Sequence, residues 1–389
     1  MTLCCNGNTR QWWRWLLVAI LWPASLLAAM LANDSLAIET PSQNTPSQNT
    51  PIQNSLVQVA LPPLPQPLSN NAVAQLSFAG RPRLYSFLGM GTGRNAGAIS
   101  RSAYEFDPDT NRWHVLPAVP GSGRLATAAI GIGRSIFLLG GYTVSQQGAE
   151  VSTPEMLRFD PLLQTYETLA AMPIPVDDSV GLGWRDRYVL LISGWNNHSN
   201  SDQVQWFDTI SERWLPSRPF PGTAVFGHAG GLLDNDLVVC GGAYVAGSTA
   251  GKRQYAQSDA CWQGKLDEKQ VGDIKWKQLS TMPGPGRYRA AAVGTRLRGR
   301  HIVFVGGSAT PYNYNGVGYD GNTAEPLAAV VAYNLNSRRW EEWGNLPTAG
   351  MDFRGLLELN GGLVTVGGME HGPKVTPVVR RFVPPSRRH

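Results

Sequence analysis

The chain has 389 residues, of which 16% are charged and 43 are glycine. Average soluble domains carry about 25% charged residues and about 7% glycine, so this composition favours strands and tight turns over helices. Much of the formal charge of +5 comes from four arginines near the two ends. No Lys/Arg stripe with interleaved aromatic residues crosses the remainder, which excludes a nucleic-acid-binding protein. The six histidines show no HxxxH or CxxC-type spacing, so we expect no metal site and no cofactor.

Residues 1–37 are predicted to be a signal peptide. Arg10 and Arg14 precede an apolar stretch over 15–32, and the small residues Ser35 and Ala37 follow it. An uncleaved membrane anchor is the alternative, because 18 apolar residues can just span a bilayer. Residues 38–55 contain a tandem TPSQN repeat without charge, which is typical of a disordered linker. We therefore expect a periplasmic or extracellular protein, free or anchored by this segment.

An internal repeat organises the rest of the chain, residues 56–385. Apolar strands end in glycines at 89/91, 140/141, 194, 241/242, 306/307 and 367/368, at intervals of 48 to 65 residues. Downstream of the first five, a strand closes on an aromatic residue, namely Trp113, Tyr166, Trp214, Trp276 and Trp340, and a Pro-containing turn follows. Glycine allows a positive φ, and the aromatic residue fills the gap between adjacent sheets, so we assign these residues to the scaffold. Six such units predict an all-β fold, a six-bladed β-propeller.

The sixth unit lacks its last strand, and residues 56–78 begin with an additional one. Pairing this N-terminal strand with the C-terminal strands would close the ring and remove two sheet edges.

These repeats are typical of kelch propellers. Together with the closing strand LPPLPQPLSNNAVA and the long insertion over 304–326, they resemble the bacterial cyclically permuted mutarotases, the N-acetylneuraminate epimerase family. The resemblance implies export and the interconversion of the anomers of sialic acid or a related acidic sugar. It also implies a catalytic Glu directly after a glycine and an Arg six residues further on. In this chain Gly242 stands where that Glu is expected, and Arg253 is the candidate for the Arg.

The mouth of the predicted propeller is formed by the loops after the glycines and the turns after the aromatic residues. Mutarotation needs a base and an acid, and an Arg can hold a carboxylate in a bidentate grip. The catalytic candidates are Arg253, Glu370, Asp177 and Asp178. Candidates for substrate binding are Arg124, His228, Arg287, Arg289, Tyr312, Asp352 and Arg354. The two aspartates could instead pair with arginines across the rim.

Two functions from different classes remain open. One is an exported sugar mutarotase, an isomerase; the other is a non-catalytic kelch module that binds a glycan or a protein partner. The galactose oxidase central domain is a more distant resemblance, but the histidines here are isolated and only Cys240 and Cys261 lie in the propeller. Cys240 is most simply a small buried hydrophobe, with a disulfide to Cys261 as the alternative.

Overall fold

The structure, a computed structural model, describes residues 56–383. They form thirty β-strands and one 3-10 turn, η1 (Ala96–Ala98), and this part of the chain contains no α-helix. The predicted signal peptide or anchor over 1–37 and the linker over 38–55 lie outside the described residues. In the range 56–383 there is no helix of the length and hydropathy needed to cross a membrane.

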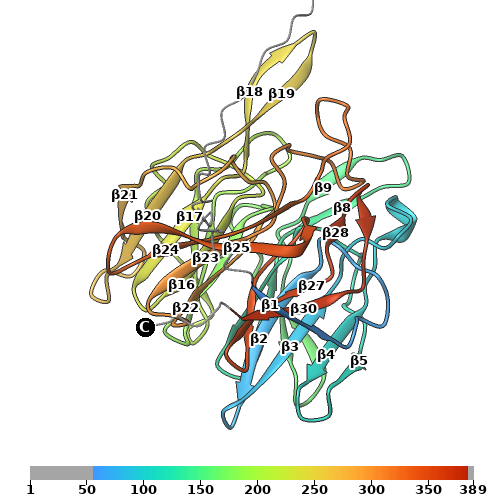
Figure 1. The fold of residues 1–389 in the computed structure, drawn as a ribbon, viewed down its shortest axis with the longest axis vertical. Coiled ribbons are helices and arrows are strands. Elements are labelled where there is room, and N and C mark those ends of the chain that lie inside the picture. The colour runs from blue at the N-terminus through green and yellow to red at the C-terminus, as the bar shows by residue number, and fades with distance from the viewer. Residues whose placement is uncertain (1–55, 384–389) are drawn as a thin grey trace, which may run out of the picture. The chain divides into compact units, whose positions relative to one another are not determined.

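Six four-stranded antiparallel sheets follow one another along the chain (Figure 1). Blade 1 consists of β2 (Ala72–Phe78), β3 (Arg81–Phe87), β4 (Ala103–Asp107) and β5 (Arg112–Leu116). Blade 2 consists of β6 (Ala128–Ile132), β7 (Ser135–Leu139), β10 (Met156–Asp160) and β11 (Thr165–Thr168). Blade 3 consists of β12 (Val180–Trp184), β13 (Tyr188–Ile192), β14 (Val204–Asp208) and β15 (Arg213–Leu215). Blade 4 consists of β16 (Ala229–Leu233), β17 (Asp236–Cys240), β20 (Cys261–Leu266) and β21 (Ile274–Gln278). Blade 5 consists of β22 (Ala291–Thr295), β23 (His301–Val305), β24 (Leu327–Asn334) and β25 (Arg339–Gly350). Blade 6 consists of β26 (Leu357–Leu359), β27 (Gly362–Val366), β30 (Val379–Val383) and β1 (Val57–Leu61).

Three two-stranded hairpins extend the even-numbered blades. They are β8 (Tyr142–Val144) with β9 (Glu150–Ser152), β18 (Ala243–Thr249) with β19 (Lys252–Gln257), and β28 (Met369–Glu370) with β29 (Lys374–Val375). Each begins directly after the glycines of its blade, so the loops predicted to form the mouth are partly built as hairpins.

The ring closes between the two ends of the described chain. Strand β1 pairs antiparallel with β30, from Val57 opposite Val383 to Leu61 opposite Val379, and the two strands lie side by side in Figure 1. The inner strands of neighbouring blades also contact one another, from β26 through β2, β6, β12 and β16 to β22. The predicted six-bladed propeller with an N-terminal closing strand is therefore confirmed.

Six of the eight hydrophobic clusters in the described residues each lie between two adjacent blades. Between blades 1 and 2, for example, Phe87 meets Phe159 edge-on at a centroid distance of 5.5 Å. The predicted closing aromatics lie at these interfaces, where the Nε1 atoms of Trp113, Trp214 and Trp340 donate to carbonyl oxygens of Pro62, Ala170 and Ser280. Each indole thus fills the space between two blades and satisfies its polar atom there, as expected of a scaffold residue.

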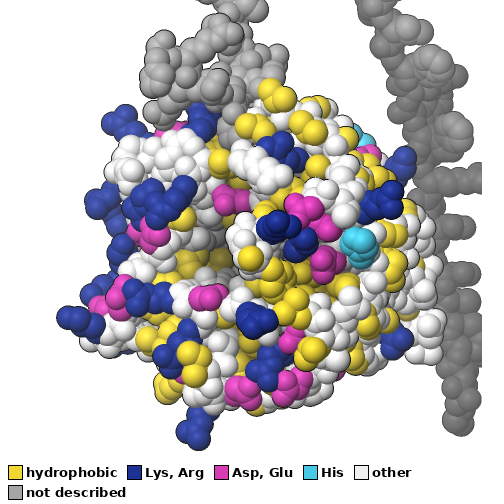
Figure 2. Space-filling model, turned by 90° about the horizontal axis from the view of Figure 1, so that it is seen from below, with side chains coloured by type: hydrophobic (Ala, Val, Ile, Leu, Met, Phe, Trp, Pro, Cys, Tyr) yellow, Lys and Arg dark blue, Asp and Glu magenta, His cyan; other side chains and the backbone are white. Residues whose placement is uncertain are grey.

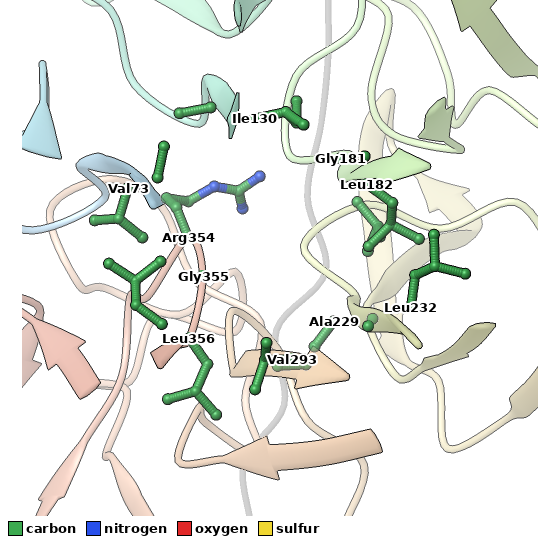
Figure 3. A pocket seen from close by; sticks show the side chains of 18 of the residues that line it. Val73, Ile130, Gly181, Leu182, Ala229, Leu232, Val293, Arg354, Gly355 and Leu356 are labelled. Carbon is green, nitrogen blue, oxygen red and sulfur yellow. The ribbon is translucent and has the colours of Figure 1, made fainter. Parts of the chain in front are cut away.

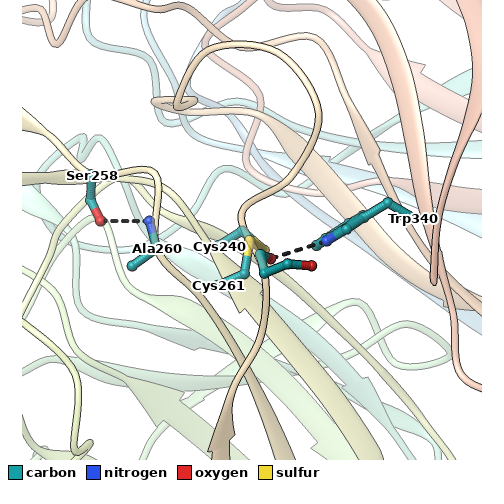
Figure 4. Close-up of a disulfide and its surroundings, with 6 residues drawn as sticks. Cys240, Ser258, Ala260, Cys261 and Trp340 are labelled. Carbon is teal, nitrogen blue, oxygen red and sulfur yellow. Dashed lines mark hydrogen bonds between the residues drawn. A yellow bond between two sulfur atoms is a disulfide. The ribbon is translucent and has the colours of Figure 1, made fainter. Parts of the chain in front are cut away.

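A disulfide joins Cys240 and Cys261 within blade 4 (Figure 4). The two residues face each other across β17 and β20, and both are buried. Of the two interpretations left open by the sequence, the structure has the disulfide, so the simpler prediction of a free buried thiol is wrong.

A central channel of about 250 Å³ runs between the inner strands. Small residues and aliphatic side chains such as Ile130, Leu182 and Val293 line it, and Arg354 is the long charged side chain that points into it (Figure 3). The space-filling view shows a hollow near the middle of one face, with hydrophobic side chains inside and charged side chains of both signs around it (Figure 2).

Candidate functional site

Each blade presents the same backbone unit just before its inner strand. The residue that follows the glycines forms a β-bridge with the turn that precedes the inner strand, as in Asp177 with Trp195 and Phe226 with Ala243. This bridge brings the two predicted sets of mouth residues together, because one set lies in the turns and the other in the loops. The repeated pattern of glycines and turns in the sequence therefore determines where the residues of the site lie.

The residue after each bridge has a positive φ and lies close to the propeller axis. These six equivalent residues, which we call the axial ring, have φ between 50° and 65° and are Asn70, Ala126, Asp178, Gly227, Arg289 and Asp352. Backbone hydrogen bonds link neighbouring blades here. The N–H of Gly227 donates to the carbonyl of Asp178 at 2.8 Å, and that of Arg289 donates to Gly227 at 2.7 Å. The ring separates two cavities, since Asp178 and Arg289 line a pocket at the mouth, whereas four residues that directly follow ring members line the central channel, namely Ser179, His228, Ala290 and Phe353.

The pocket at the mouth, hereafter the mouth pocket, has a volume of about 170 Å³ and draws its walls from blades 2 to 5. Its lining residues are Tyr142, Glu150, Asp177, Asp178, Trp195, Asn197, Phe226, Arg253, Tyr255, Arg289, Asn313, Tyr314 and Tyr319. Aromatic faces, amides, two arginines and three carboxyl groups thus meet in one cavity. The exposed surface of this pocket is mainly polar, and aromatic faces make up part of the remainder.

An ion network closes the floor of the mouth pocket. Arg289 donates to Asp178 at 2.6 Å and to Asp352 at 3.1 Å, and Arg354 donates to Asp178 at 2.6 Å. Asp352 also accepts hydrogen bonds from Asn70 and from the hydroxyl of Tyr312. These four charged side chains are at most 4% exposed. Because buried charges must be paired, the network holds the axial ring in one arrangement.

The two consecutive aspartates have opposite electrostatic environments. Burial acts to raise the pKa of Asp178, but Arg289 and Arg354 outweigh it and hold that pKa below its ordinary value. Burial, and then the charge of Asp178, raise the pKa of Asp177 well above its ordinary value, although the hydroxyl of Ser152 donates to it at 2.6 Å. Asp178 therefore stays ionised, while Asp177 tends to keep its proton.

Glu150 adds a third carboxyl group from the β8–β9 hairpin. The residue lies at the solvent-exposed rim of the mouth pocket, yet desolvation raises the pKa of its carboxyl against the opposing charge of Arg289. No prediction from the sequence included this residue. The signal was the length of the segment GYTVSQQGAEVS after Gly140, because a long loop at that position reaches the mouth.

Two arginines, Arg253 and Arg289, line the mouth pocket. Of these, Arg253 has no carboxylate partner among residues 56–383. It lies on β19, its guanidinium carbon is 5.1 Å from the ring centroid of Trp195, and its Nη2 atom donates to the carbonyl of His198 at 3.1 Å. The side chain is exposed. It is therefore available to an anionic ligand, and Trp195 holds it in place.

The structure brings some of the predicted site residues together and places others elsewhere. Arg253, Asp177, Asp178 and Arg289 line the mouth pocket; Asp352, Arg354 and Tyr312 belong to the network beneath it, and His228 lines the channel. Arg124 and Arg287 are buried at equivalent positions of blades 2 and 5, where Arg124 pairs with Glu155 and both donate to backbone carbonyls. Glu370 pairs with Arg380 and lines neither cavity. Three predicted residues are thus separated from the pocket, because their partners lie within their own part of the scaffold.

The described residues offer little to a metal ion. In the range 56–383 no group of three His, Cys, Asp or Glu side chains is placed to hold one. The polar side chains that line the mouth pocket carry carboxyl, guanidinium, amide and phenol groups.

Comparisons with known proteins find similar sequences in kelch proteins. No family model matches the chain. It is 23% identical to Kelch-like protein 15 of Mus musculus over 257 residues, which are 65% of this chain and 40% of that protein. It is 26% identical to Kelch-like protein 33 of Homo sapiens over 161 residues and 23% identical to Kelch-like protein 35 of Mus musculus over 280 residues. The chain thus spans less than half the length of these relatives.

The solved structure of YjhT shares the fold. The two structures align with a TM-score of 0.64 at 16% sequence identity, over 83% of this chain and 95% of that one. Likeness at this level of identity concerns the architecture, and it agrees with the blade count and the kelch repeats. The described part of the chain is a six-bladed kelch-type β-propeller closed by its N-terminal strand.

Proposed function

We propose that the mouth pocket binds an acidic sugar and interconverts its anomers. One observation carries this proposal: a single cavity holds an arginine without a carboxylate partner in the described chain, aromatic faces, and two carboxyl groups with raised pKa values. The volume of about 170 Å³ is below the roughly 300–1,000 Å³ of pockets for drug-sized ligands, which suits one sugar residue. The resemblance to mutarotases in the repeats and the closing strand supports the same reaction.

Anomer interconversion requires two proton transfers. A base takes the proton of the anomeric hydroxyl while an acid protonates the ring oxygen, so that the bond from the anomeric carbon to the ring oxygen breaks and a free carbonyl forms. The ring then closes on the other face of that carbonyl with both protons returned. General acid–base catalysis works best when the pKa of the group is near the working pH, which is above the ordinary pKa of a carboxylic acid.

The environments in the mouth pocket suggest which group takes each role. Asp177, whose pKa is raised most strongly, is suited to donate the proton, and Glu150 at the rim is suited to accept one. Asp178 serves neither role because two arginines neutralise it. Arg253 is placed to hold the carboxylate of the sugar. Glu150 from blade 2 would then supply the carboxylate that Gly242 of blade 4 lacks.

We further propose that the protein acts outside the cytoplasm, in the periplasm or beyond the cell. The disulfide between Cys240 and Cys261 supports this, because such bonds persist in oxidising compartments and are rare in the cytosol. The predicted signal peptide or anchor over 1–37 is consistent with the same route.

NMR exchange spectroscopy on N-acetylneuraminate tests the proposal. The protein should accelerate the exchange of the anomers, and Glu150→Gln should slow the catalysed rate by about 10²–10⁴ while sugar binding is retained. Arg253→Gln should weaken binding about tenfold to a hundredfold, the value of a hydrogen bond between charged groups. Arg213→Gln, an exposed arginine on outer strand β15, is the matched control and should change neither quantity. An exchange rate equal to that of the sugar alone would exclude sialic acid mutarotation.

A non-catalytic kelch module is the second candidate. Gly242 in place of the expected Glu and the likeness to Kelch-like proteins favour it. In that case the same mouth would bind a glycan or a protein partner. Sugar-induced chemical shift changes without accelerated exchange would identify a binding module.

A further inference from the structure

The mouth pocket opens into a wider groove along the β18–β19 hairpin. This hairpin projects from blade 4 beyond the rest of the propeller (Figure 1). The groove has a volume of about 700 Å³, and Arg253, Tyr255 and Tyr319 line both the groove and the mouth pocket. The two cavities therefore adjoin at these three residues, and a ligand that passes them would reach from the pocket along the hairpin.

Two tyrosines form the boundary between the cavities. The rings of Tyr255 and Tyr319 are stacked, with centroids 4.1 Å apart and planes inclined by 28°. Both side chains are half-buried, so one part of this aromatic pair is held by protein and another part is open to the cavities. An aromatic platform at such a boundary is able to contact a sugar ring on either side.

The groove is basic and has few aliphatic side chains. Its walls include the small residues Gly247, Ser248 and Gly251, and Val245 is its only aliphatic side chain larger than a methyl group. Lys252 is exposed and, like Arg253, has no carboxylate partner among residues 56–383. The two cationic side chains, Lys252 and Arg253, therefore make this surface suitable for an anionic ligand.

We propose that the mouth pocket and the groove are two subsites for an acidic oligosaccharide. The reducing-end sugar occupies the pocket, where its anomeric centre meets the carboxyl groups, and the next acidic sugar lies in the groove with its anionic group near Lys252. This proposal rests on the proposed function, because it takes the pocket to bind the sugar that reacts. It extends the substrate class from a single acidic sugar to a chain of at least two.

Calorimetric titration of the full chain with N-acetylneuraminate and with disialic acid, its linked dimer, tests the two-subsite arrangement. The dimer should bind at least tenfold more tightly than the monomer. Lys252→Gln should weaken dimer binding about three- to fivefold, the range for one exposed ion pair, and leave monomer binding unchanged. Lys277→Gln, an exposed lysine on outer strand β21 that lines no cavity described above, is the control with the same loss of charge. The advantage of the dimer should also shrink as salt is raised.

Each outcome decides one of the two proposals. If both ligands bind equally, or if Lys252→Gln weakens monomer and dimer binding alike, the second subsite is wrong while the mutarotase proposal stands. If the dimer binds more tightly through Lys252 but neither sugar shows accelerated anomer exchange, the subsite stands and the catalytic proposal fails. If neither ligand binds, both are overturned.

Discussion

Replacing Arg289 by methionine should destabilise the propeller strongly. Methionine keeps a long side chain at this position of the axial ring but removes the charge that pairs with Asp178 and Asp352. Asp178 would retain its ion pair with Arg354, whereas Asp352 would retain hydrogen bonds from Asn70, Tyr312 and Ser69 but no ion pair. The variant thus leaves one carboxyl group without a directly paired cation at a position that is fully buried.

The magnitude follows from the burial of this pair. Removing one partner of a buried ion pair costs about 3–5 kcal/mol, because the other charge stays desolvated. The unfolding entropy is about 2.1 cal/mol/K per residue, so the described 56–383 segment corresponds to roughly 0.7 kcal/mol/K. The expected decrease in Tm is therefore about 4–7 °C.

The loss should also depend on pH. Burial already raises the pKa of Asp352 above its ordinary value, and Arg289 opposes that rise. Without Arg289 the pKa rises further, so the folded variant binds a proton that the unfolded chain releases at neutral pH. A group with a raised folded pKa loses its stabilising contribution as pH increases through that pKa. The difference in Tm between wild type and variant should therefore be larger at pH 8 than at pH 5.

Thermal unfolding followed by circular dichroism at both pH values measures this effect. Arg296→Met is the matched control, because Arg296 pairs with Asp234 at 2.7 Å but the two side chains are 65% and 44% exposed. Such a surface pair contributes at most about 1 kcal/mol. A decrease in Tm for Arg289→Met that is no larger than for the control, or equal at both pH values, would refute the reasoning.

Three further predictions concern other parts of the scaffold. Burial and then Arg354 lower the pKa of His228 to about 3, so the unfolded chain binds more protons below pH 6.5. The free energy of unfolding should fall by about 2–3 kcal/mol between pH 6.5 and 4.5, and His228→Gln should make this decrease smaller. Parallel pH profiles of the wild type and the variant would contradict the prediction. The Cys240–Cys261 disulfide closes a loop with a sequence separation of 21. Its reduction should lower the free energy of unfolding, measured by denaturant titration, by about 3 kcal/mol. A decrease below about 1 kcal/mol would contradict this prediction. Gly242→Glu should lower Tm without increasing anomer exchange. Gly242 has φ of +88°, and a Cβ there would lie 2.8 Å from the carbonyl oxygen of Phe226, so the variant is strained. A variant with an unchanged Tm would show that this strain is absent.

The fold could be predicted from the sequence because the repeat is set by packing. The glycines end the second strands of all six blades, and the closing aromatics fill the spaces between blades in the first five, so both recur regardless of function. The incomplete sixth unit predicted the closing strand, since an unpaired strand at one end and a missing strand at the other fit one sheet. These features depend on backbone geometry and side-chain volume, which a single sequence displays directly.

The site was less predictable because its residues lie at positions that packing leaves free. Position in the repeat predicts Asp177 and Asp178 at the mouth, where both line the pocket, but it gives no information on which arginine pairs with a carboxylate. Glu370 lies in the predicted loop of its blade, yet its carboxylate forms an ion pair with Arg380 of strand β30. Glu150 went unnoticed because the β8–β9 hairpin carries no repeat signal.

The axial ring shows where this repeat protein departs from its own symmetry. Six equivalent residues share a positive φ, which most side chains disfavour and which glycine, asparagine and aspartate adopt more readily. Four of the ring positions follow that preference, whereas Ala126 and Arg289 do not. Arginine at such a position costs backbone strain that no turn requirement explains, and it is offset by the ion pairs with Asp178 and Asp352. Because Arg289 also lines the mouth pocket, its strained backbone, its buried charge and the candidate site coincide at one residue, so the same side chain stabilises the ring and forms a wall of the pocket.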